Sequence, residues 1–245
     1  MKFELNEERN GYTLVSSDDV PTVVIPQEYD GKPVTRIGDG AFDECTSLTS
    51  IIIPDSVTSI GEGAFQNCIS LTTITIPDSV TSIEGLAFYG CEALTSVKMG
   101  KNVRSIGKGA FHCCRSLMDM YISKNVMVIG QGAFWGCESL KSVIISNSVT
   151  IIGDYAFAVC TSLTSVTIPN SVTSIGRGAF AVCTSLTSVT IGNSVTSIYA
   201  QAFSNCKSLK SVYYNGDRAS WDKIVFGIGD ANPLCYGATL HINED

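Results

Sequence analysis

Apolar and polar residues along most of the chain follow a pattern that repeats every 23 residues. One copy reads LTSIIIPDSVTSIGEGAFQNCIS, beginning at Leu48. The leucine that opens this copy recurs at positions 48, 71, 94, 117, 140, 163, 186 and 209. A fixed period of this length is typical of solenoids, in which each unit forms one coil and can bury its apolar face only against neighbouring coils.

Two extended segments are predicted in each unit. Leu48, Ile51 and Ile53 place apolar residues at the spacing of a short strand that points alternate side chains inward. Pro54 follows and ends that strand, because proline cannot donate a ladder hydrogen bond. Further along, Val57 and an isoleucine three residues later predict a second inward-facing segment. That isoleucine column occupies positions 37, 60, 83, 106, 129, 152, 175 and 198.

The remaining part of the unit predicts a compact turn. Gly61 and Gly63 allow the backbone to reverse. Ala64, Phe65 and Cys68 have helical spacing, which predicts one inward-packing helical turn. The phenylalanine recurs at 42, 65, 88, 111, 134, 157, 180 and 203, and the cysteine follows it by three residues each time.

These columns resemble the BspA-type leucine-rich repeat family, whose signature is L-x-x-(I/V)-x-(I/L)-P-x-x-(V/L)-x-x-I-x-x-x-A-F-x-x-C. The resemblance covers roughly residues 20–212. It implies a leucine-rich-repeat solenoid: a β-rich right-handed coil array with short helical or 3-10 turns, about eight repeats, capped at both ends. Each coil should advance by ~5 Å, the spacing of paired strands, for a total of ~40 Å.

The ends depart from the period, and each is expected to cover the solenoid core. Residues 1–19 predict an N-terminal cap of two strands joined at Asn10-Gly11. The solenoid spans 20–212, with an atypical first repeat at 20–47 and seven regular repeats at 48–208. An insertion in the first repeat, around 29–32, is expected to form a turn.

Residues 213–245 predict the C-terminal cap. Asp217 can cap a short helix whose apolar face carries Trp221, Ile224 and Val225. Alternation at 238, 240 and 242 predicts a closing strand. Trp221 is therefore expected to seal the last coil and not to bind a ligand.

Charge and hydropathy narrow the classes of partner. The formal net charge is −7 and no basic run occurs, which argues against nucleic acid and anionic membranes as ligands. No apolar run approaches the ~20 residues of a membrane span, so membrane insertion is not expected. The first ten residues lack the apolar stretch of a signal peptide, which leaves a cytoplasmic location open. The family resemblance implies a secreted or cell-surface protein.

Ten cysteines raise the question of disulfides or metal. Eight of them occupy the single column described above, where a free thiol is a good small core residue. They lack the paired C-x₂-C elements of zinc sites. Cys113 and Cys235 lie outside the column and are the more reactive candidates.

Catalytic chemistry is not expected. The chain has two histidines, His112 and His241, and contains no nucleotide-binding loop, nucleophile elbow or metalloprotease motif. The many serine and threonine hydroxyls have no evident base to activate them. We therefore expect no enzyme activity and no cofactor or metal.

Candidate binding residues are those that depart from an otherwise regular column, and they define three surfaces in the central coils. On the outer face of the leading strands, Lys98, Asp119, Tyr121 and Ile144 interrupt a serine and threonine background. Tyrosine beside aliphatic and charged groups is typical of an interaction centre.

The second surface belongs to the second extended segment, and the third follows the Ala-Phe pair. Met127, together with residues 128 and 151, makes an apolar break in the second segment. Tyr89, His112 and Trp135 occupy one column on successive coils, which predicts a strip of stacked aromatic rings. A neighbouring column predicts a surface ion ladder, with Arg115 between two glutamates, which would contribute little stability.

Binding through these surfaces predicts a non-enzymatic protein-binding or adhesion scaffold. The family resemblance implies attachment to host extracellular-matrix proteins such as fibronectin and fibrinogen, and cell-cell contact. Two alternatives remain at this stage: a glycan-binding module, because exposed aromatic rings can stack on sugars, and a self-associating structural repeat protein.

Overall fold

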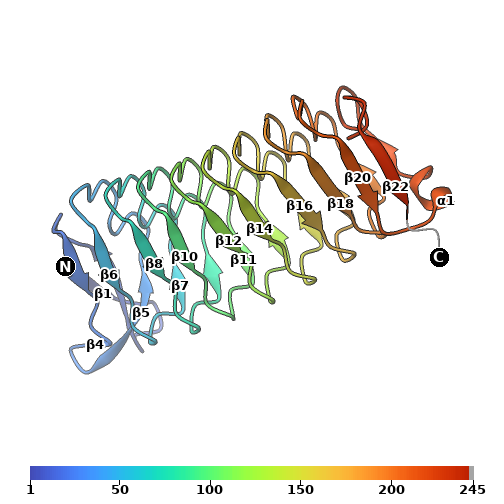
Figure 1. Cartoon of the computed structure of the whole chain (residues 1–245). Coiled ribbons are helices and arrows are strands. Elements are labelled where there is room, and N and C mark those ends of the chain that lie inside the picture. The colour runs from blue at the N-terminus through green and yellow to red at the C-terminus, as the bar shows by residue number, and fades with distance from the viewer. Residues whose placement is uncertain (243–245) are drawn as a thin grey trace.

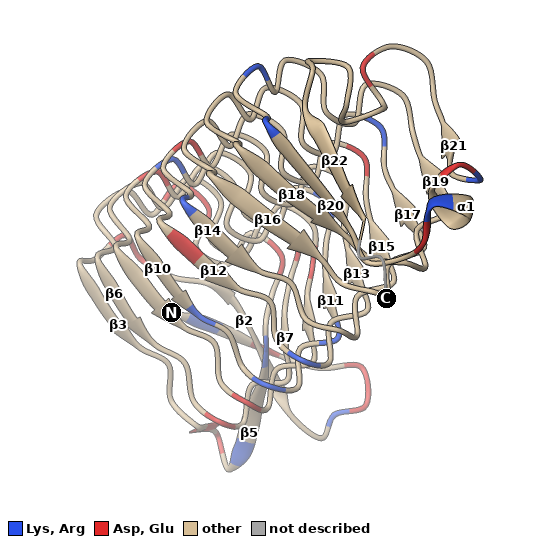
Figure 2. Ribbon diagram, turned by 45° about the vertical axis from the view of Figure 1, so that its right-hand side comes forward, with Lys and Arg blue, Asp and Glu red and all other residues tan. Residues whose placement is uncertain are grey.

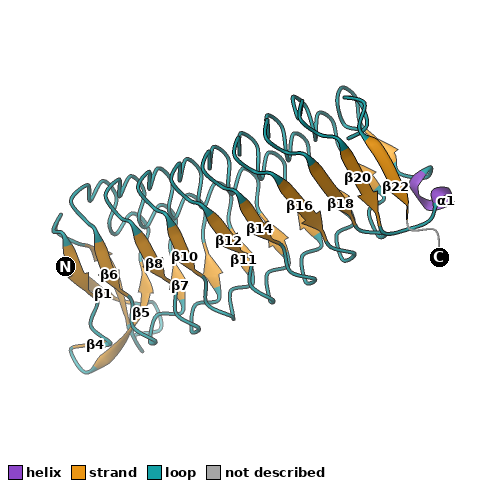
Figure 3. Cartoon of the chain, viewed as in Figure 1, coloured by secondary structure: helices purple, strands orange, loops and turns teal. Residues whose placement is uncertain are grey.

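The computed structural model describes residues 1–242 and shows an elongated solenoid in which successive coils stack along one axis (Figure 1). The last three residues of the predicted C-terminal cap, 243–245, lie outside the described residues. Almost all regular structure is β, as Figure 3 shows. The leading strands are β3 (Thr22–Val24), β6 (Ser50–Ile52), β8 (Thr73–Thr75), β10 (Ser96–Lys98), β12 (Asp119–Tyr121), β14 (Ser142–Ile144), β16 (Ser165–Ile168), β18 (Ser188–Ile191), β20 (Ser211–Tyr214) and β22 (Thr239–Ile242).

The second extended segments form one continuous parallel ladder. In this ladder each residue pairs with its equivalent one repeat later, such as Ser59 with Ser82 and Ile60 with Ile83. The leading strands pair in the same register but divide into four shorter sheets. The ladder strands are β5 (Lys32–Ile37), β7 (Ser59–Ile60), β9 (Ser82–Ile83), β11 (Ser105–Ile106), β13 (Val128–Ile129), β15 (Ile151–Ile152), β17 (Ser174–Ile175), β19 (Ser197–Ile198) and β21 (Val225–Phe226).

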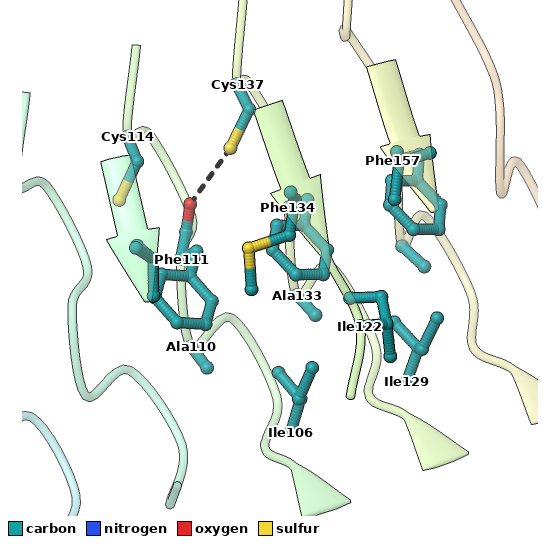
Figure 4. Packing of buried hydrophobic residues seen from close by; sticks show 14 of the residues in the cluster. Ile106, Ala110, Phe111, Cys114, Ile122, Ile129, Ala133, Phe134, Cys137 and Phe157 are labelled. Carbon is teal, nitrogen blue, oxygen red and sulfur yellow. Dashed lines mark hydrogen bonds between the residues drawn. The ribbon is translucent and has the colours of Figure 1, made fainter. Parts of the chain in front are cut away.

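The core between the two sets of strands is built from the repeated apolar columns. Eight phenylalanine rings, from Phe42 to Phe203, are fully buried and stack with centroid separations of 4.9 Å at the first pair and 5.5 Å at the last. These separations confirm the predicted advance of ~5 Å per coil. Each buried column thiol except the first donates to a phenylalanine carbonyl of the preceding coil, as Cys137 does to Phe111 at 3.2 Å (Figure 4).

The turn after the second strand differs from the predicted helical turn. Cys68 N–H bonds to Phe65 O and Ala64 N–H to Gly61 O, which are the i→i+3 bonds of tight turns and agree with the 3-10 alternative. Phe65 N–H instead donates to the next coil, to the carbonyl of Ala87 at 2.7 Å. A helix cannot continue here because alternate backbone N–H groups donate to carbonyls of the neighbouring coil and not to carbonyls of their own turn.

Both ends of the solenoid are covered. At the N-terminus, β1 (Lys2–Leu5) and β2 (Tyr12–Ser16) form an antiparallel hairpin, and β2 continues the long ladder by pairing with β5. In the first repeat, β4 (Glu28–Tyr29) pairs with the start of β5 through a turn whose two central residues, Asp30 and Gly31, have φ of 48° and 72°. The predicted strands and the predicted turn are confirmed.

At the C-terminus, α1 (Arg218–Trp221) is capped by Asp217, whose carboxylate accepts from Ser220 N–H at 2.7 Å. Trp221 and Ile224 are buried, in agreement with a sealing role. The prediction for Val225 is wrong, because this residue begins β21 and pairs with the outward-facing Ser197, which leaves it 66% exposed. No helix formed by residues 1–242 is long and apolar enough to span a bilayer.

Candidate binding surfaces

The structure separates the predicted binding residues between two sides of the coil. Asp119 and Tyr121 point outward from β12, beside Lys98 on β10 and Ile144 on β14. In Figure 2 the red of Asp119 marks β12, whereas β16 and β18 further along are tan. Met127 immediately precedes β13, which belongs to the other sheet. The first predicted surface therefore does not join the second.

The leading-strand patch is an open strand surface. Tyr121 and Ile144 face each other in register and are 54% and 60% exposed. Asp119 accepts a hydrogen bond from the hydroxyl of Ser142 at 2.6 Å, so part of its carboxylate is already engaged. An exposed pair of apolar residues is a contact surface, but single exposed apolar side chains are common on folded proteins.

The predicted aromatic strip is present. Ring centroids of Tyr89 and His112 lie 5.1 Å apart, and those of His112 and Trp135 lie 4.4 Å apart, with interplanar angles of 35° and 25°. The rings cover one another's faces along the solenoid axis. Ala158 follows Trp135 in the column and is itself buried, so the row ends against a covered residue. Within the strip, His112 therefore lies between the other two rings.

Beside this strip lies a trough of about 410 Å³, which we call the aromatic trough. Its floor consists of Gly109 and Gly132, and His112 and Trp135 form one wall. The residues that line it are Leu86, Tyr89, Lys108, Gly109, His112, Gln131, Gly132, Trp135 and Tyr155. Sequence reasoning found the aromatic residues of this site but not the other residues that line it.

The trough exists because one column changes residue type. At this position of the repeat the backbone has positive φ, and glycine occupies it in most coils, including Gly109 and Gly132. Leu86 and Tyr155 occupy the same position one coil before and one coil after that pair, with φ of 55° and 56°. Two small residues between two large ones leave a hollow. Positive φ at a non-glycine residue is not confined to these two positions, because Gln201 has it in the same column and Asn67 and Val159 have it in another column.

Two polar residues also line the trough. Lys108 and Gln131 are exposed and immediately precede the two floor glycines. His112 is half-buried, and the loss of solvent lowers its pKa from the ordinary value, so the imidazole is neutral at pH 7. The site therefore combines a neutral apolar wall with one cation and one amide.

The second predicted surface lies next to the trough along the same coils. Met127, Val128 and Ile151 are 57%, 38% and 44% exposed on the outer face of the long sheet. The chain reaches Gln131 two residues after β13 ends. The second and third predicted surfaces are thus adjacent, and only the leading-strand patch stands apart.

The remaining predicted features are the ion ladder around Arg115 and the two cysteines outside the buried column. Arg115 lies 3.2 Å from Glu92 and 3.6 Å from Glu138, which confirms the ion ladder; all three side chains are about half exposed, so the ladder contributes little. Burial raises the pKa of both Cys113 and Cys235, which works against thiolate formation at neutral pH. No cluster of three metal-ligating side chains occurs within residues 1–242.

The chain is similar to a known family of repeat proteins. The sequence profile of the BspA type leucine rich repeat region, described as six copies, matches residues 35–162 and 128–227. No curated protein sequence matches the chain significantly.

Solved structures of bacterial proteins share the fold. A leucine-rich repeat protein of T. pallidum is 31% identical with a TM-score of 0.70, covering 76% of this chain and 87% of that protein. A leucine-rich repeat protein of Bacteroides ovatus is 30% identical with a TM-score of 0.54, covering 87% and 69% respectively. The pneumococcal vaccine antigen PcpA, at 15% identity and a TM-score of 0.52, covers 95% and 92% and shows the fold alone. The profile match and the two nearer structures together establish that the chain belongs to the BspA-type leucine-rich repeat family.

Proposed function

We propose that this chain is a non-enzymatic protein-binding module, and that an apolar side chain of a protein partner enters the aromatic trough. The observation that carries the proposal is the trough itself, in which two glycines lie between the larger side chains of Leu86 and Tyr155. Repeat proteins of this type are scaffolds, and the family is typically found at cell surfaces. We place the module at the cell surface or outside the cell, with a host extracellular-matrix protein as the first partner to test.

The chemistry of the walls favours a protein over a sugar. Sugar rings stack on the open faces of aromatic rings, but His112 lies between two rings, and Tyr89 and Trp135 each turn one face toward it. What remains open is a concave apolar space with ring edges, Leu86 and Tyr155. An aliphatic or aromatic side chain fills such a space well, and Trp and Tyr are the residue types that most often anchor protein interfaces.

The energetics are consistent with a moderate anchor on a rigid surface. Burying one Leu, Met or Phe side chain contributes about 1.5–3 kcal/mol. The trough requires little ordering, because its backbone N–H groups are held by the neighbouring coil, as Gly109 N–H is by Gln131 O at 2.8 Å. Lys108 and Gln131 then supply polar contacts at the rim.

The test compares single substitutions on the two sides of the coil. Immobilised fibronectin and fibrinogen serve as probes, and surface plasmon resonance measures the affinity. Trp135→Ala and Tyr155→Ala should each weaken binding about tenfold or more, as expected for an anchor residue. Tyr121→Ala on the leading strands and Tyr213→Ala near the C-terminal end are matched controls and should change affinity little.

Three results would contradict this proposal. Equal loss from Tyr121→Ala would move the site to the leading strands. Capture of glycans on an array, abolished by Trp135→Ala, would favour the glycan-binding alternative. A concentration-dependent mass in light scattering, together with no affinity for the two matrix proteins, would favour self-association.

A further inference from the structure

Positive charge is concentrated in one part of this acidic chain. Six of the sixteen Lys and Arg residues, but only one of the twenty-three Asp and Glu residues, lie between Lys98 and Lys124. This stretch therefore carries +5 within a chain of net charge −7. The stretch is slightly longer than one 23-residue repeat. Its cations therefore lie around the circumference of about one coil, which we call a belt, and not along the length of the solenoid.

Part of this belt opens into a groove of about 420 Å³ at the start of β11 and β13, which we call the basic corner. Arg104 and Lys124 bring the cations, and Met127 brings an apolar side chain. The lining residues are Asn102, Arg104, Lys124, Asn125, Met127 and Ser148. Within residues 1–242, none of the seven ion pairs involves Arg104 or Lys124.

The basic corner lacks side-chain hydrogen bonds that the regular coils form. In other coils, threonine at the Arg104 position donates its hydroxyl to the carbonyl one coil back, as Thr81 does to Thr58 at 3.3 Å and Thr173 to Thr150 at 3.3 Å. Arg104 and Met127 lack that hydroxyl, so two consecutive links of this ladder are missing. An exposed thioether in place of a bonded threonine does not help the solenoid to fold.

The turn before these strands shows a similar exchange. Asp78 accepts from the backbone N–H of Lys101 at 2.9 Å, and Asn170 accepts from that of Asn193 at 3.2 Å. The side chain of Lys101 has no hydrogen-bond acceptor, so it cannot accept from the backbone N–H of Lys124 as Asp78 and Asn170 accept in their coils. The lysines at 101 and 124 therefore replace residues with a structural role. Lys101 is paired with Asp78 at 2.7 Å, so Lys124 is the one of the two that adds positive charge to the groove.

The amide groups around the groove are held in place from below. Asn102 and Asn125 donate their side-chain N–H groups to the carbonyls of Asp78 and Lys101, both at 2.8 Å. The groove therefore has a fixed rim. Its cations require an anionic ligand, and its apolar residue requires that the ligand also carry an apolar group.

We propose that the basic corner docks an acidic segment of a protein partner, with carboxylates at Arg104 and Lys124 and an apolar side chain on Met127. The apolar strip continues from Met127 to Val128 and Ile151, all exposed. An anionic polysaccharide would satisfy the cations but would leave this strip uncovered. A peptide that places aliphatic residues beside its glutamates or aspartates covers both. This surface is separate from the aromatic trough and does not require it.

The test uses the full chain with three probes: a fluorescent peptide of alternating glutamate and leucine, a glutamate-glycine peptide of equal charge, and a heparin hexasaccharide. Binding is measured by fluorescence anisotropy for the two peptides and by calorimetry for heparin. We expect the glutamate-leucine peptide to bind most tightly. Its affinity should fall as salt rises, because screening weakens contacts between exposed charges.

The variant Arg104→Thr/Lys124→Asp restores the residue types that these columns carry in regular coils, so it should fold. It should weaken binding of the glutamate-leucine peptide about tenfold or more, since two exposed charge contacts are lost and one is reversed. Met127→Thr should bring the affinities for the two peptides close together. Trp135→Ala in the trough is the matched control and should leave both unchanged.

Unchanged peptide affinity in Arg104→Thr/Lys124→Asp would overturn the proposal, and so would the absence of saturable binding at low salt. Tighter binding of heparin than of either peptide would assign the corner to a polysaccharide and would also overturn it. Loss of binding in Trp135→Ala would show that the peptide occupies the trough instead.

Discussion

The row of buried thiols predicts that this protein loses stability steeply at alkaline pH. Burial raises the pKa of the column thiols, to about 11 for Cys45 and further for Cys114 and Cys137. An unfolded chain exposes these thiols, and their pKa then returns to about 8.5. The seven column thiols whose pKa is raised are Cys45, Cys68, Cys91, Cys114, Cys137, Cys160 and Cys183.

The sign of the effect follows from proton counting. Above the unfolded pKa, the unfolded chain releases thiol protons that the folded chain keeps, so the free energy of unfolding falls as pH rises. Stability is complete below about pH 8 and declines until the folded thiols themselves titrate. One unit above the unfolded pKa, each thiol that stays protonated in the folded chain removes about 1.4 kcal/mol. The pKa of six of these thiols, all except Cys91, is raised far enough for this, so together they remove roughly 8 kcal/mol. A typical domain has 5–15 kcal/mol in total, so unfolding is expected between about pH 9 and pH 10.

Urea unfolding followed by circular dichroism, at a series of pH values from neutral to alkaline, measures this decline. A phosphine reductant keeps every thiol reduced throughout. The variant Cys137→Ala removes one buried thiol and should lower the slope by about 1.4 kcal/mol per pH unit. Cys235→Ala, which removes an exposed thiol, is the matched control and should change the slope less.

A free energy of unfolding that stays constant to about pH 10 would refute this reasoning, because it would mean that the column thiols titrate alike in the folded and unfolded chain. An unchanged slope in Cys137→Ala would show that other groups cause the decline. Burial also raises the pKa of Tyr12, Tyr214 and Tyr236, so these tyrosines add to the decline with the same sign, chiefly near and above their ordinary pKa of about 10.

Three further outcomes are expected. Phe134→Ala should lower the free energy of unfolding by about 3–5 kcal/mol in urea, since it empties a fully buried site between two stacked rings; a loss below about 1 kcal/mol would contradict close packing there. Asp217→Ala should speed amide exchange at Ser220, because it removes the carboxylate that accepts from the Ser220 N–H. Hydrogen bonds from Ser220 hold the pKa of Asp217 below its ordinary value, so the native chain should lose the same protection as pH falls through that pKa. Exchange at Ser220 that does not change with pH would contradict this. A thiol reagent should label Cys113 and Cys235 in the folded chain before any column cysteine, and early labelling of the column would indicate open coils.

Much of the fold could be predicted because the same physical constraint acts at every coil. A residue such as Phe111 must face the core in its own coil and also match Phe88 and Phe134 on either side. Eight repetitions make the apolar columns unmistakable, and they fix both the strand register and the stacking of coils. The two caps could be located for the opposite reason, since the columns end there.

The turn and the trough could not be predicted as readily. Ala64, Phe65 and Cys68 have a spacing that fits a helix, but the sequence does not show that alternate N–H groups bond to the next coil. The trough depends on which side chains share a corner. One signal was available, namely that Leu86 and Tyr155 replace glycine on either side of a pair of glycines, in a column where Gln201 is the one other replacement. The sequence alone does not show which other columns of the repeat lie beside the position where glycine is replaced.

The position of both candidate sites along the solenoid has a physical consequence. Each coil of a repeat array is stabilised by the coils on either side, so the ends open first and the centre last. The aromatic trough and the basic corner lie in the central coils, between Leu86 and Tyr155. The missing threonine bonds at Arg104 and Met127 therefore lie where neighbours on both sides can compensate for them. The same loss in an end coil would loosen the cap, and this difference is a reason to interpret the gap at Arg104 and Met127 as part of a binding surface.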